Sequence, residues 1–353
     1  MKDKEFGYAM KALRMVIRRE WHRMTSRRLY LGVCVVLPLL CLFFMATIFG
    51  NGQMENIPVG IVDLDNTATS RNISRRISAA PTFRVTEHFT DEADARRALQ
   101  QKDIYGYLVI PPRFEQKAVT GTGATLTYYY HYALLSVGSE LMAAFENTLA
   151  PVALSPIVMQ AEALGVSGEQ IQTFLLPVEA STHPLYNPDM DYSIYLSQPF
   201  FFVLFQILIL LTTVYSIGSE LKFGSAGEWL EMARGNILTA VAGKLLPYTL
   251  IFSSIGILAN YVLFGPLHIP FAGSLWLMNA VTVLFIIATQ ALAVFIYSVF
   301  PKIAYIISVV SMVGSLGATL SGVTFPVTAM YAPVHAASYL FPVRHFTEAA
   351  QAM

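Results

Sequence analysis

Few residues of this chain have the chemistry of a catalytic or metal site, and they are scattered. Asp63, Asp65 and Asn66 follow the apolar run IPVGIV, and paired carboxylates after a strand can bind hard cations. A calcium loop would also need a glycine at its sixth position and a glutamate downstream, and both are missing here. We therefore interpret these residues as a strand end followed by a helix N-cap.

The histidines and cysteines also lack the pattern of a metal site. His88, His131 and His183 do not have the spacing of zinc ligands, which favours solvated or packed histidines. Cys34 and Cys41 lie seven residues apart in one apolar segment, on one side of a single helix, so they cannot join distant parts of the chain. The sequence predicts neither a metal nor a cofactor in this chain.

Motifs for nucleotide hydrolysis are absent from the sequence. The nearest approach to a phosphate-binding loop, Gly243-Lys244-Leu245, lacks both the hydroxyl residue and the upstream glycine. There is no nucleophile elbow and no H-E-x-x-H pattern. An intramembrane enzyme would need catalytic groups within the membrane, whereas His268, His335 and His345 are expected near its outer surface. If the chain moves a solute against its concentration gradient, the energy must therefore come from a partner protein.

The composition indicates a membrane protein. Of 353 residues, 55% are hydrophobic and 13% charged, and the mean hydropathy is +0.52. Four apolar stretches lack Asp, Glu, Lys and Arg, and each can hold at least one helix of about 20 residues, the length that crosses a bilayer. These stretches are 29–54, 192–219, 245–301 and 303–343. The predicted spans lie near 29–50, 198–218, 243–264, 272–299 and 303–322. Because these stretches lack Asp, Glu, Lys and Arg, we expect no proton relay within the spans.

The charges flanking these spans predict the orientation of the chain. Residues 1–28 carry nine Lys or Arg and three acids, an excess that marks the cytoplasmic side. Alternation of the spans then places the strip 218–242 and the Pro301-Lys302 turn in the cytoplasm. The segments 51–197, 265–271 and 323–353 are expected outside.

The N-terminal segment has the pattern of an amphipathic helix. Apolar residues recur at steps of three and four, and bases occupy the remaining positions. The apolar positions are Phe6, Met10, Leu13, Ile17, Trp21 and Met24. We expect residues 1–28 to lie at the membrane surface, with this stripe at the acyl boundary and the bases against anionic lipid headgroups.

The segment 51–197 is predicted to form an α/β domain. From 57 to 130, short β-like runs alternate with helical runs. A long helical stretch follows from about Leu134 to Leu164, with Pro151 and Pro156 as kinks or a break. Alternation places Tyr128, Tyr130 and Tyr132 on one strand face, where half-buried aromatic side chains explain them better than a ligand platform does.

A small polar strip, GSELKFGSAGEWLEMARGN, separates two apolar spans at residues 218–236. Glu228, Trp229, Leu230 and Met232 fall on a short amphipathic helix, which is suited to a groove on a soluble protein. The strip is therefore predicted to be a docking surface.

The strip and the block after it resemble the permease of ATP-binding-cassette exporters of the second class (ABC type-2), in which R-E-x-E-x-G-T-x-E-x-L-L-x-T-P precedes G-K-L-x-P-Y. The matching residues are Glu220, Gly224, Ser225, Glu228, Leu230 and the block Gly243-Lys244-Leu245-Leu246-Pro247-Tyr248. Ser225 replaces threonine, Met232-Ala233 replaces a leucine and its neighbour, and Arg234-Gly235 stands where Thr-Pro is usual. Residues 57–85 resemble the opening of the family's extracytoplasmic domain, and 320–346 its broken, outward-facing closing segment.

The resemblance implies an α-helical transmembrane bundle with an inserted extracytoplasmic α/β domain, in the cytoplasmic (inner) membrane of a bacterium. It implies a dimer with a second copy or a similar permease, and two ATPase subunits that carry the ATP and Mg. The residues expected to couple to the ATPase are Glu220, Lys222, Glu228, Arg234, Pro301 and Lys302, with Glu228 and Arg234 forming salt bridges. A periplasmic adaptor and an outer-membrane channel are further candidate partners; nucleic acid is not.

The expected cargo is hydrophobic or amphipathic, such as a drug, a lipid-like molecule or a peptide, because the path that the resemblance suggests has a mostly apolar lining. The fold suggests a path along the first and fifth spans, whose polar lining would be Ser308, Ser311, Ser315 and Thr319. Five spans leave the C-terminus outside, whereas the family has a sixth, so we expect the native chain to continue past Met353. The alternative function is that of a membrane-anchored sensor or scaffold with an extracytoplasmic ligand-binding domain.

Overall fold

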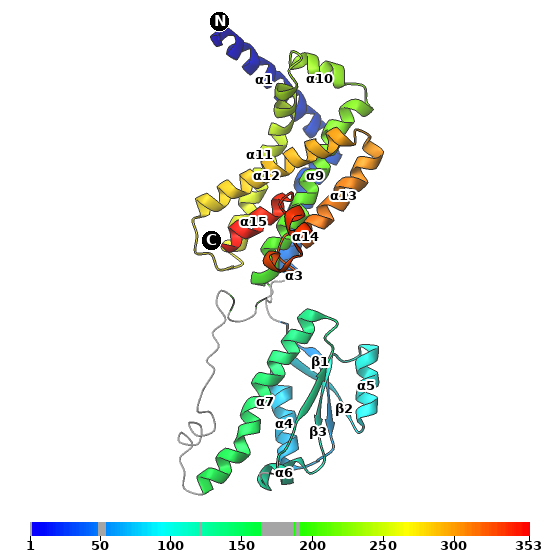
Figure 1. The fold of residues 1–353 in the computed structure, drawn as a ribbon, viewed down its shortest axis with the longest axis vertical. Coiled ribbons are helices and arrows are strands. Elements are labelled where there is room, and N and C mark those ends of the chain that lie inside the picture. Colours follow the sequence, from blue (N-terminus) through cyan, green and yellow to red (C-terminus); the bar gives the residue numbers. More distant parts are fainter. Residues whose placement is uncertain (1, 49–53, 121, 164–186, 188–190, 192) are drawn as a thin grey trace. The chain divides into compact units, whose positions relative to one another are not determined.

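The computed structural model describes residues 2–48, 54–120, 122–163, 187, 191 and 193–353 (Figure 1). The chain divides into two compact units. One is helical and comprises Met1–Gly52 and Leu185–Met353, and the other is an α/β unit, Gln53–Pro184. His183 and Leu164, the predicted end of the long helical stretch, lie outside the described residues, as do the last two residues of the predicted first span.

The helical unit is built from long apolar helices joined by short turns. Its elements are α1 (Lys2–Ser26), α2 (Arg28–Leu31), the π-helical turn η1 (Gly32–Val36), α3 (Leu37–Ile48), the π-helical turn η2 (Ser193–Ser197), α9 (Gln198–Lys222), α10 (Ala226–Met232), α11 (Ile237–Phe264), α12 (Leu275–Val299), α13 (Ile303–Leu320), the 3₁₀ turn η3 (Val327–Ala329), α14 (Ala332–Ser338) and α15 (Pro342–Gln351).

Five of these helical segments are long and apolar enough to cross a membrane. They are Arg28–Ile48, Ser193–Lys222, Ile237–Phe264, Leu275–Val299 and Ile303–Leu320. Helices satisfy their own backbone hydrogen bonds, which lipid cannot do. The five predicted spans are confirmed, and the second and third helices begin earlier than expected.

Helix α9 lies at the centre of this unit and is buried along most of its length. Its neighbour α13 approaches it closely at two glycines: a Cβ on Gly314 would lie 2.5 Å from Ile207, and one on Gly317 would lie 2.6 Å from the Gln206 amide nitrogen. Small residues at such contacts allow two membrane helices to pack tightly where no hydrophobic effect drives them together.

The chain beyond α13 turns back into the bundle. Gly322 adopts a φ of 89°, and η3, α14 and α15 follow. Phe346 of α15 packs on Phe202 of α9 and Phe285 of α12, with ring centroids 3.9 and 5.1 Å away. The predicted broken segment 323–353 is therefore present as short helices held by aromatic contacts.

The α/β unit contains a four-stranded sheet. Its elements are β1 (Ile57–Asp63), α4 (Ala68–Ala79), β2 (Phe83–Phe89), α5 (Glu92–Gln101), β3 (Gly106–Ile110), α6 (Phe114–Thr120), β4 (Thr127–Tyr130) and α7 (Leu135–Ala163). The strand order is β2-β1-β3-β4; β1 pairs in parallel with β2 and β3, and β4 is antiparallel to β3. Helix α7 is continuous through Pro151 and Pro156, so of the two predicted alternatives, kinks or a break, the break does not occur.

Helices cover both faces of this sheet (Figure 1). Ile57, Val59 and Ile61 of β1 pack with residues of α4 and α7, whereas Val62 packs with Ala95 of α5 on the other face. Central strands that are buried on both sides read as continuous apolar runs, which is why IPVGIV lacks a polar alternation.

The carboxylates after β1 are structural. Asp63 Oδ1 accepts hydrogen bonds from the backbone N–H groups of Asp65 and Asn66, both at 3.0 Å. Thr67 and Ser70 form a capping box at the start of α4. Asp65 accepts from the N–H groups of Phe114 and Glu115, at 2.9 and 3.0 Å, and so caps α6. Among the described residues no group of ligands could hold a metal ion.

Replacing Asp65 with alanine should loosen the start of α6. A lost N-cap costs about 1 kcal/mol, so the amides of Phe114 and Glu115 should exchange roughly fivefold faster in the full-length protein. Glu92→Ala, at a partly exposed site in the first turn of α5, is the control. Unchanged exchange at both amides would contradict the cap.

The contribution of Asp65 should depend on pH. Burial raises the pKa of Asp65, but hydrogen bonds from Thr67 and the backbone of residues 113–115 outweigh it and hold the pKa below its usual value. The stabilisation is thus present above the ordinary carboxyl pKa near 3.9 and is lost as the pH falls through the lower folded value. The melting-temperature difference between wild type and Asp65→Asn should shrink as the pH falls from the ordinary carboxyl pKa through the lower folded value. A difference that stays constant over this range would contradict the stabilising role of the Asp65 carboxylate.

Candidate coupling site

The predicted polar strip forms a short helix between two tight turns. Gly224 has a φ of 67°, and Arg234 and Gly235 have φ values of 54° and 76°, so left-handed residues bracket α10. The Asn236 side chain then accepts a hydrogen bond from Thr239 N–H at 3.1 Å and caps α11. Trp229 is the buried residue of α10, whereas Glu228 and Leu230 are exposed. The predicted amphipathic helix is confirmed.

Directly beside α10, five charged side chains from three helices meet. Lys244 of α11 donates to Glu20 of α1 at 2.7 Å and to Glu220 of α9 at 2.6 Å. Arg19 and Arg23 of α1 also bind Glu220, Arg19 with both of its terminal nitrogens, at 2.8 and 3.0 Å. The Lys244 and Glu220 side chains have no exposed surface. We call these five residues the ion network.

Hydroxyl groups complete the ion network. Tyr248, one turn after Lys244, donates to Glu20 at 2.7 Å. Arg23 donates to Ser219 at 3.0 Å. Buried charges are tolerated when they are paired and hydrogen-bonded, and both carboxylates meet this condition. The bond to Glu220 raises the pKa of Arg19 above its ordinary value, which keeps that guanidinium charged.

Two contacts connect α10 to the ion network. Ser225, at the start of the helix, donates to Glu220 at 2.5 Å. The Trp229 ring lies 5.3 Å from the Lys244 ammonium, and its indole N–H donates to the Ala240 carbonyl at 3.1 Å. A displacement of α10 must therefore disturb contacts of both Glu220 and Lys244.

The N-terminal helix α1 packs closely against α11. A Cβ on Gly243 would lie 2.9 Å from Val16, so glycine permits the close approach of the two helices. Val16, Trp229, Ala233 and Ala240 form a small apolar cluster that includes all three helices α1, α10 and α11. The Gly-Lys-x-x-Pro-Tyr block thus supplies the α1 contact surface and two partners of Glu20.

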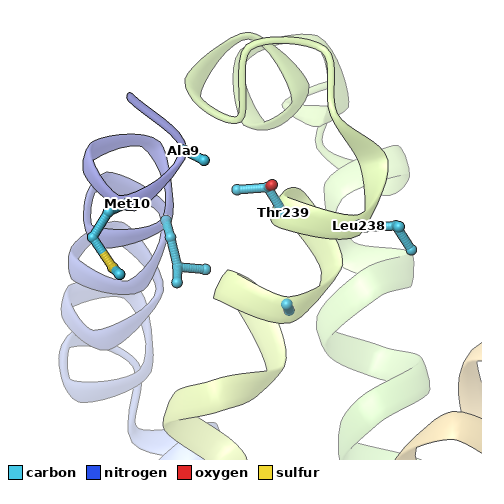
Figure 2. A pocket seen from close by; sticks show the side chains of 6 residues that line it. Ala9, Met10, Leu238 and Thr239 are labelled. Carbon is cyan, nitrogen blue, oxygen red and sulfur yellow. The ribbon is translucent and has the colours of Figure 1, made fainter. Parts of the chain in front are cut away.

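An open apolar groove lies between α1 and α11, next to this contact. Its volume is about 320 Å³. The lining residues are Ala9, Met10, Leu13, Leu238, Thr239 and Ala242. Figure 2 shows Ala9 and Thr239 lying toward one another across the groove.

The structure brings the predicted coupling residues to one end of the bundle, but it does not expose all of them. Lys222, Glu228 and Arg234 are exposed on or beside α10, and Arg234 lies 4.7 Å from the Tyr8 ring. Pro301 and Lys302 are exposed in the α12–α13 turn, and that turn lies at the α10 end because Gly218 packs against Tyr297 and Ile303.

Glu220 departs from the prediction. Its side chain is fully buried and holds bases from two helices, so it has no surface to offer a partner. Glu220 and Lys244 also correct our expectation that the spans lack ionisable residues, because both lie within spanning helices that extend past the charge-free stretches.

Helix α1 buries a face that only partly coincides with the predicted apolar stripe. Ala12, Val16 and Glu20 pack inward together with Met24 of the stripe, whereas Met10 and Trp21 of the stripe stay exposed. Glu20, Arg19 and Arg23 escaped prediction because charged residues on an amphipathic helix read as its solvated face. The available signal was Lys244: an ammonium inside an apolar run requires a buried acid.

The predicted polar path residues lie together on one helix face. Ser308, Ser311, Ser315 and Thr319 are all exposed on α13. The opposite face, with Ile306, Val310, Gly314 and Gly317, packs inward. The four hydroxyl groups thus form a stripe on the outside of this single chain.

The five helices long and apolar enough to cross a bilayer, with the short helix α10 between two of them, indicate a multi-pass membrane protein. A family model described as ABC-2 family transporter protein matches residues 28–353, so the chain belongs to this family of transporter permeases. No curated protein and no solved structure matches it. Membership implies an ATP-binding-cassette partner subunit, and the family is generally a non-enzymatic transport component.

Removing Lys244 should destabilise the helical unit. In Lys244→Met, Glu20 keeps the hydrogen bond from Tyr248 but loses its lysine partner, and Glu220 loses one of its three basic partners. Breaking a buried ion pair in this way costs about 3–5 kcal/mol of folding free energy. The melting temperature in detergent should fall by roughly 5–15 °C. The control Lys222→Met alters an exposed lysine of α9 and should change the melting temperature little. Equal melting temperatures for the two variants would contradict the structural role of the ion network.

Proposed function

We propose that this chain is the permease of an ATP-driven exporter and that α10 is the helix on which the partner ATPase acts. The observation that carries this proposal is the pair of contacts from α10 to the ion network, Ser225 with Glu220 and Trp229 with Lys244. Because these contacts reach α1, α9 and α11, a push on α10 is transmitted to two spanning helices and to the N-terminal helix together.

Glu228 and Arg234 supply the contacts to the ATPase in this proposal. Both are exposed and have opposite charges, so an ATPase surface with the complementary charges can bind them in one defined orientation. Lys222 and the Pro301-Lys302 turn, exposed at the same end, are further contacts. ATP and Mg bind the partner, and the chain itself supplies the membrane path.

The α10 end of the bundle is the cytoplasmic end in this proposal. The Lys/Arg excess of residues 1–28 supports this side, and α1 packs against the start of α11 at the same end. The N-terminus is then cytoplasmic, the α/β unit extracytoplasmic, and the membrane the inner membrane of a bacterium. A periplasmic adaptor and an outer-membrane channel fit such a location.

A homodimer would give the hydroxyl stripe of α13 a role. The stripe is exposed among apolar side chains such as Tyr305, Met312 and Leu316, and between two copies it would line a path that is mostly apolar. Such a lining suits a hydrophobic or amphipathic cargo, taken from the cytoplasm or the inner leaflet.

Exchanging the charges of Glu228 on α10 and Arg234 just after it should separate the permease from its ATPase. The double variant Glu228→Arg/Arg234→Glu should reduce at least tenfold the ATP-binding-cassette subunit that copurifies with the tagged chain and is identified by mass spectrometry. Glu92→Arg/Arg96→Glu exchanges an ion pair between a partly exposed glutamate and an exposed arginine of the α/β unit and is the matched control. Full copurification with the α10 variant would contradict α10 as the docking helix.

Enlarging the α13 stripe should affect transport without affecting assembly. Ser311→Trp places a bulky group on the exposed face, so efflux of an amphipathic fluorescent dye should slow several-fold while the ATPase still copurifies. Ser298→Trp, exposed at the end of α12, is the control. Normal efflux in Ser311→Trp and Ser315→Trp would exclude this stripe from the path.

A further inference from the structure

Strand β4 is one edge of the sheet in the α/β unit. The strand order places it beside β3 alone. His131 N–H donates to the Tyr105 carbonyl at 2.8 Å, and Tyr129 is opposite Tyr107, so these positions direct their backbone groups toward β3. Because the direction alternates along an antiparallel strand, Tyr128 and Tyr130 point their N–H and C=O groups outward. Within the described part of the chain, these groups have no hydrogen-bond partner.

The two edges of the sheet are built differently. Strand β2 has a register irregularity opposite Val59 and Gly60 and carries exposed Arg84 and Glu87. Bulges and charges are the devices by which proteins protect an edge from pairing. The β4 segment 124–132, ATLTYYYHY, contains no charge and no proline. Strand β4 is thus the edge that is open to pairing.

We propose that β4 pairs antiparallel with β4 of a second copy of this chain, an inference that rests on the proposed homodimer. A two-fold axis at Tyr129 lets Tyr128 and Tyr130 exchange backbone hydrogen bonds with Tyr130 and Tyr128 of the second copy. The two Tyr129 residues then face each other as a non-hydrogen-bonded pair, with Cα atoms about 4.5 Å apart. The result is a continuous eight-stranded sheet.

A second copy suits this edge better than an unrelated strand does. The segment is neutral, so its self-pairing brings no like charges together. Four residues bury too little area to hold two proteins by themselves, and the pairing therefore needs a partner already kept nearby. A permease dimer meets this condition, because the axis that relates its two spanning bundles also relates its two α/β units.

The aromatic side chains of β4 favour an extended sheet as well. Tyr128 and Tyr130 stack with ring centroids 5.9 Å apart, and Tyr130 contacts Tyr132 at 5.9 Å. On the opposite face Tyr129 stacks on Tyr107 at 4.9 Å. Across the proposed axis both rows continue into the second copy, where cross-strand aromatic pairs stabilise a ladder.

A cysteine at the proposed axis tests the pairing directly. Tyr129→Cys is placed in the full-length chain with Cys34→Ala and Cys41→Ala, purified in detergent, and oxidised with copper phenanthroline. The expected result is that most of the protein becomes a disulfide-linked dimer. Thr86→Cys, exposed on β2, is the control and should stay unlinked. Light scattering measures the oligomeric state of both variants before oxidation.

The outcomes separate this inference from the proposed function. Dimeric particles in which Tyr129→Cys stays unlinked would overturn the β4 pairing and leave the permease dimer intact. Monomeric particles would overturn both. A dimer linked equally through Thr86→Cys would show random collision and would overturn the pairing.

A second variant tests the edge without oxidation. Tyr129→Lys places two ammonium groups face to face at the axis, so the amides of Tyr128 and Tyr130 should exchange at least tenfold faster, whereas Thr86→Lys should leave them unchanged. Protection that survives in Tyr129→Lys would point to a partner other than β4 of a second copy and would overturn the inference.

Discussion

The buried pairing of Glu220 with Lys244 is the constraint on which the helical unit depends. Neither side chain is exposed, and a buried charge without a partner is strongly destabilising. Three further groups are needed to satisfy the pair: Glu20, Arg19 and Arg23, all from α1. Helix α1 therefore cannot leave α9 and α11 without exposing or orphaning several charges, and it belongs to the bundle rather than only to the membrane surface.

Because of this buried pairing, a movement of α10 affects the spanning helices. A short helix on a flexible strip could move without consequence for the spans. Here Ser225 and Trp229 contact Glu220 and Lys244 directly, so α10, α1 and the adjacent ends of α9 and α11 form one connected element. In the proposed exporter, this element receives the force from the ATPase. Residues 2–26 of α1 lie outside the matched region 28–353, yet they supply three of the five charges in the ion network.

The sequence was sufficient to predict the spans, because apolar runs of the required length have few alternatives. It also predicted α10 and the alternation of the α/β unit, since charge, period and turn residues agree there. It did not predict that Glu220 is buried. A carboxylate beside lysine and glycine reads as part of a solvated strip, and its burial depends on arginines about 200 positions away. The same holds for Glu20, which is surrounded by bases in the sequence but turned toward Lys244 by the packing of α1.

The stripe of α13 was predictable as a pattern but its exposure was not, because periodicity alone does not say which helix face meets α9. Gly314 and Gly317 determine which face of α13 meets α9, because they allow close contact with that helix. The opposite face then points outward and carries Ser308, Ser311, Ser315 and Thr319. In the α/β unit, likewise, the pairing of Asp65 with α6 joins residues about 50 positions apart and becomes visible only in the fold.

In the proposed exporter, α10 and α1 move as one element. Spin-label distance measurements on the complete transporter test it most directly, with one label pair at Arg18 and Glu231 and a second pair at Glu231 and Ser298, all exposed sites. Between the ATP-free and the vanadate-trapped states, the account predicts an unchanged distance between Arg18 and Glu231 and a changed distance between Glu231 and Ser298. A change in the first distance, with α10 moving away from α1, would contradict it.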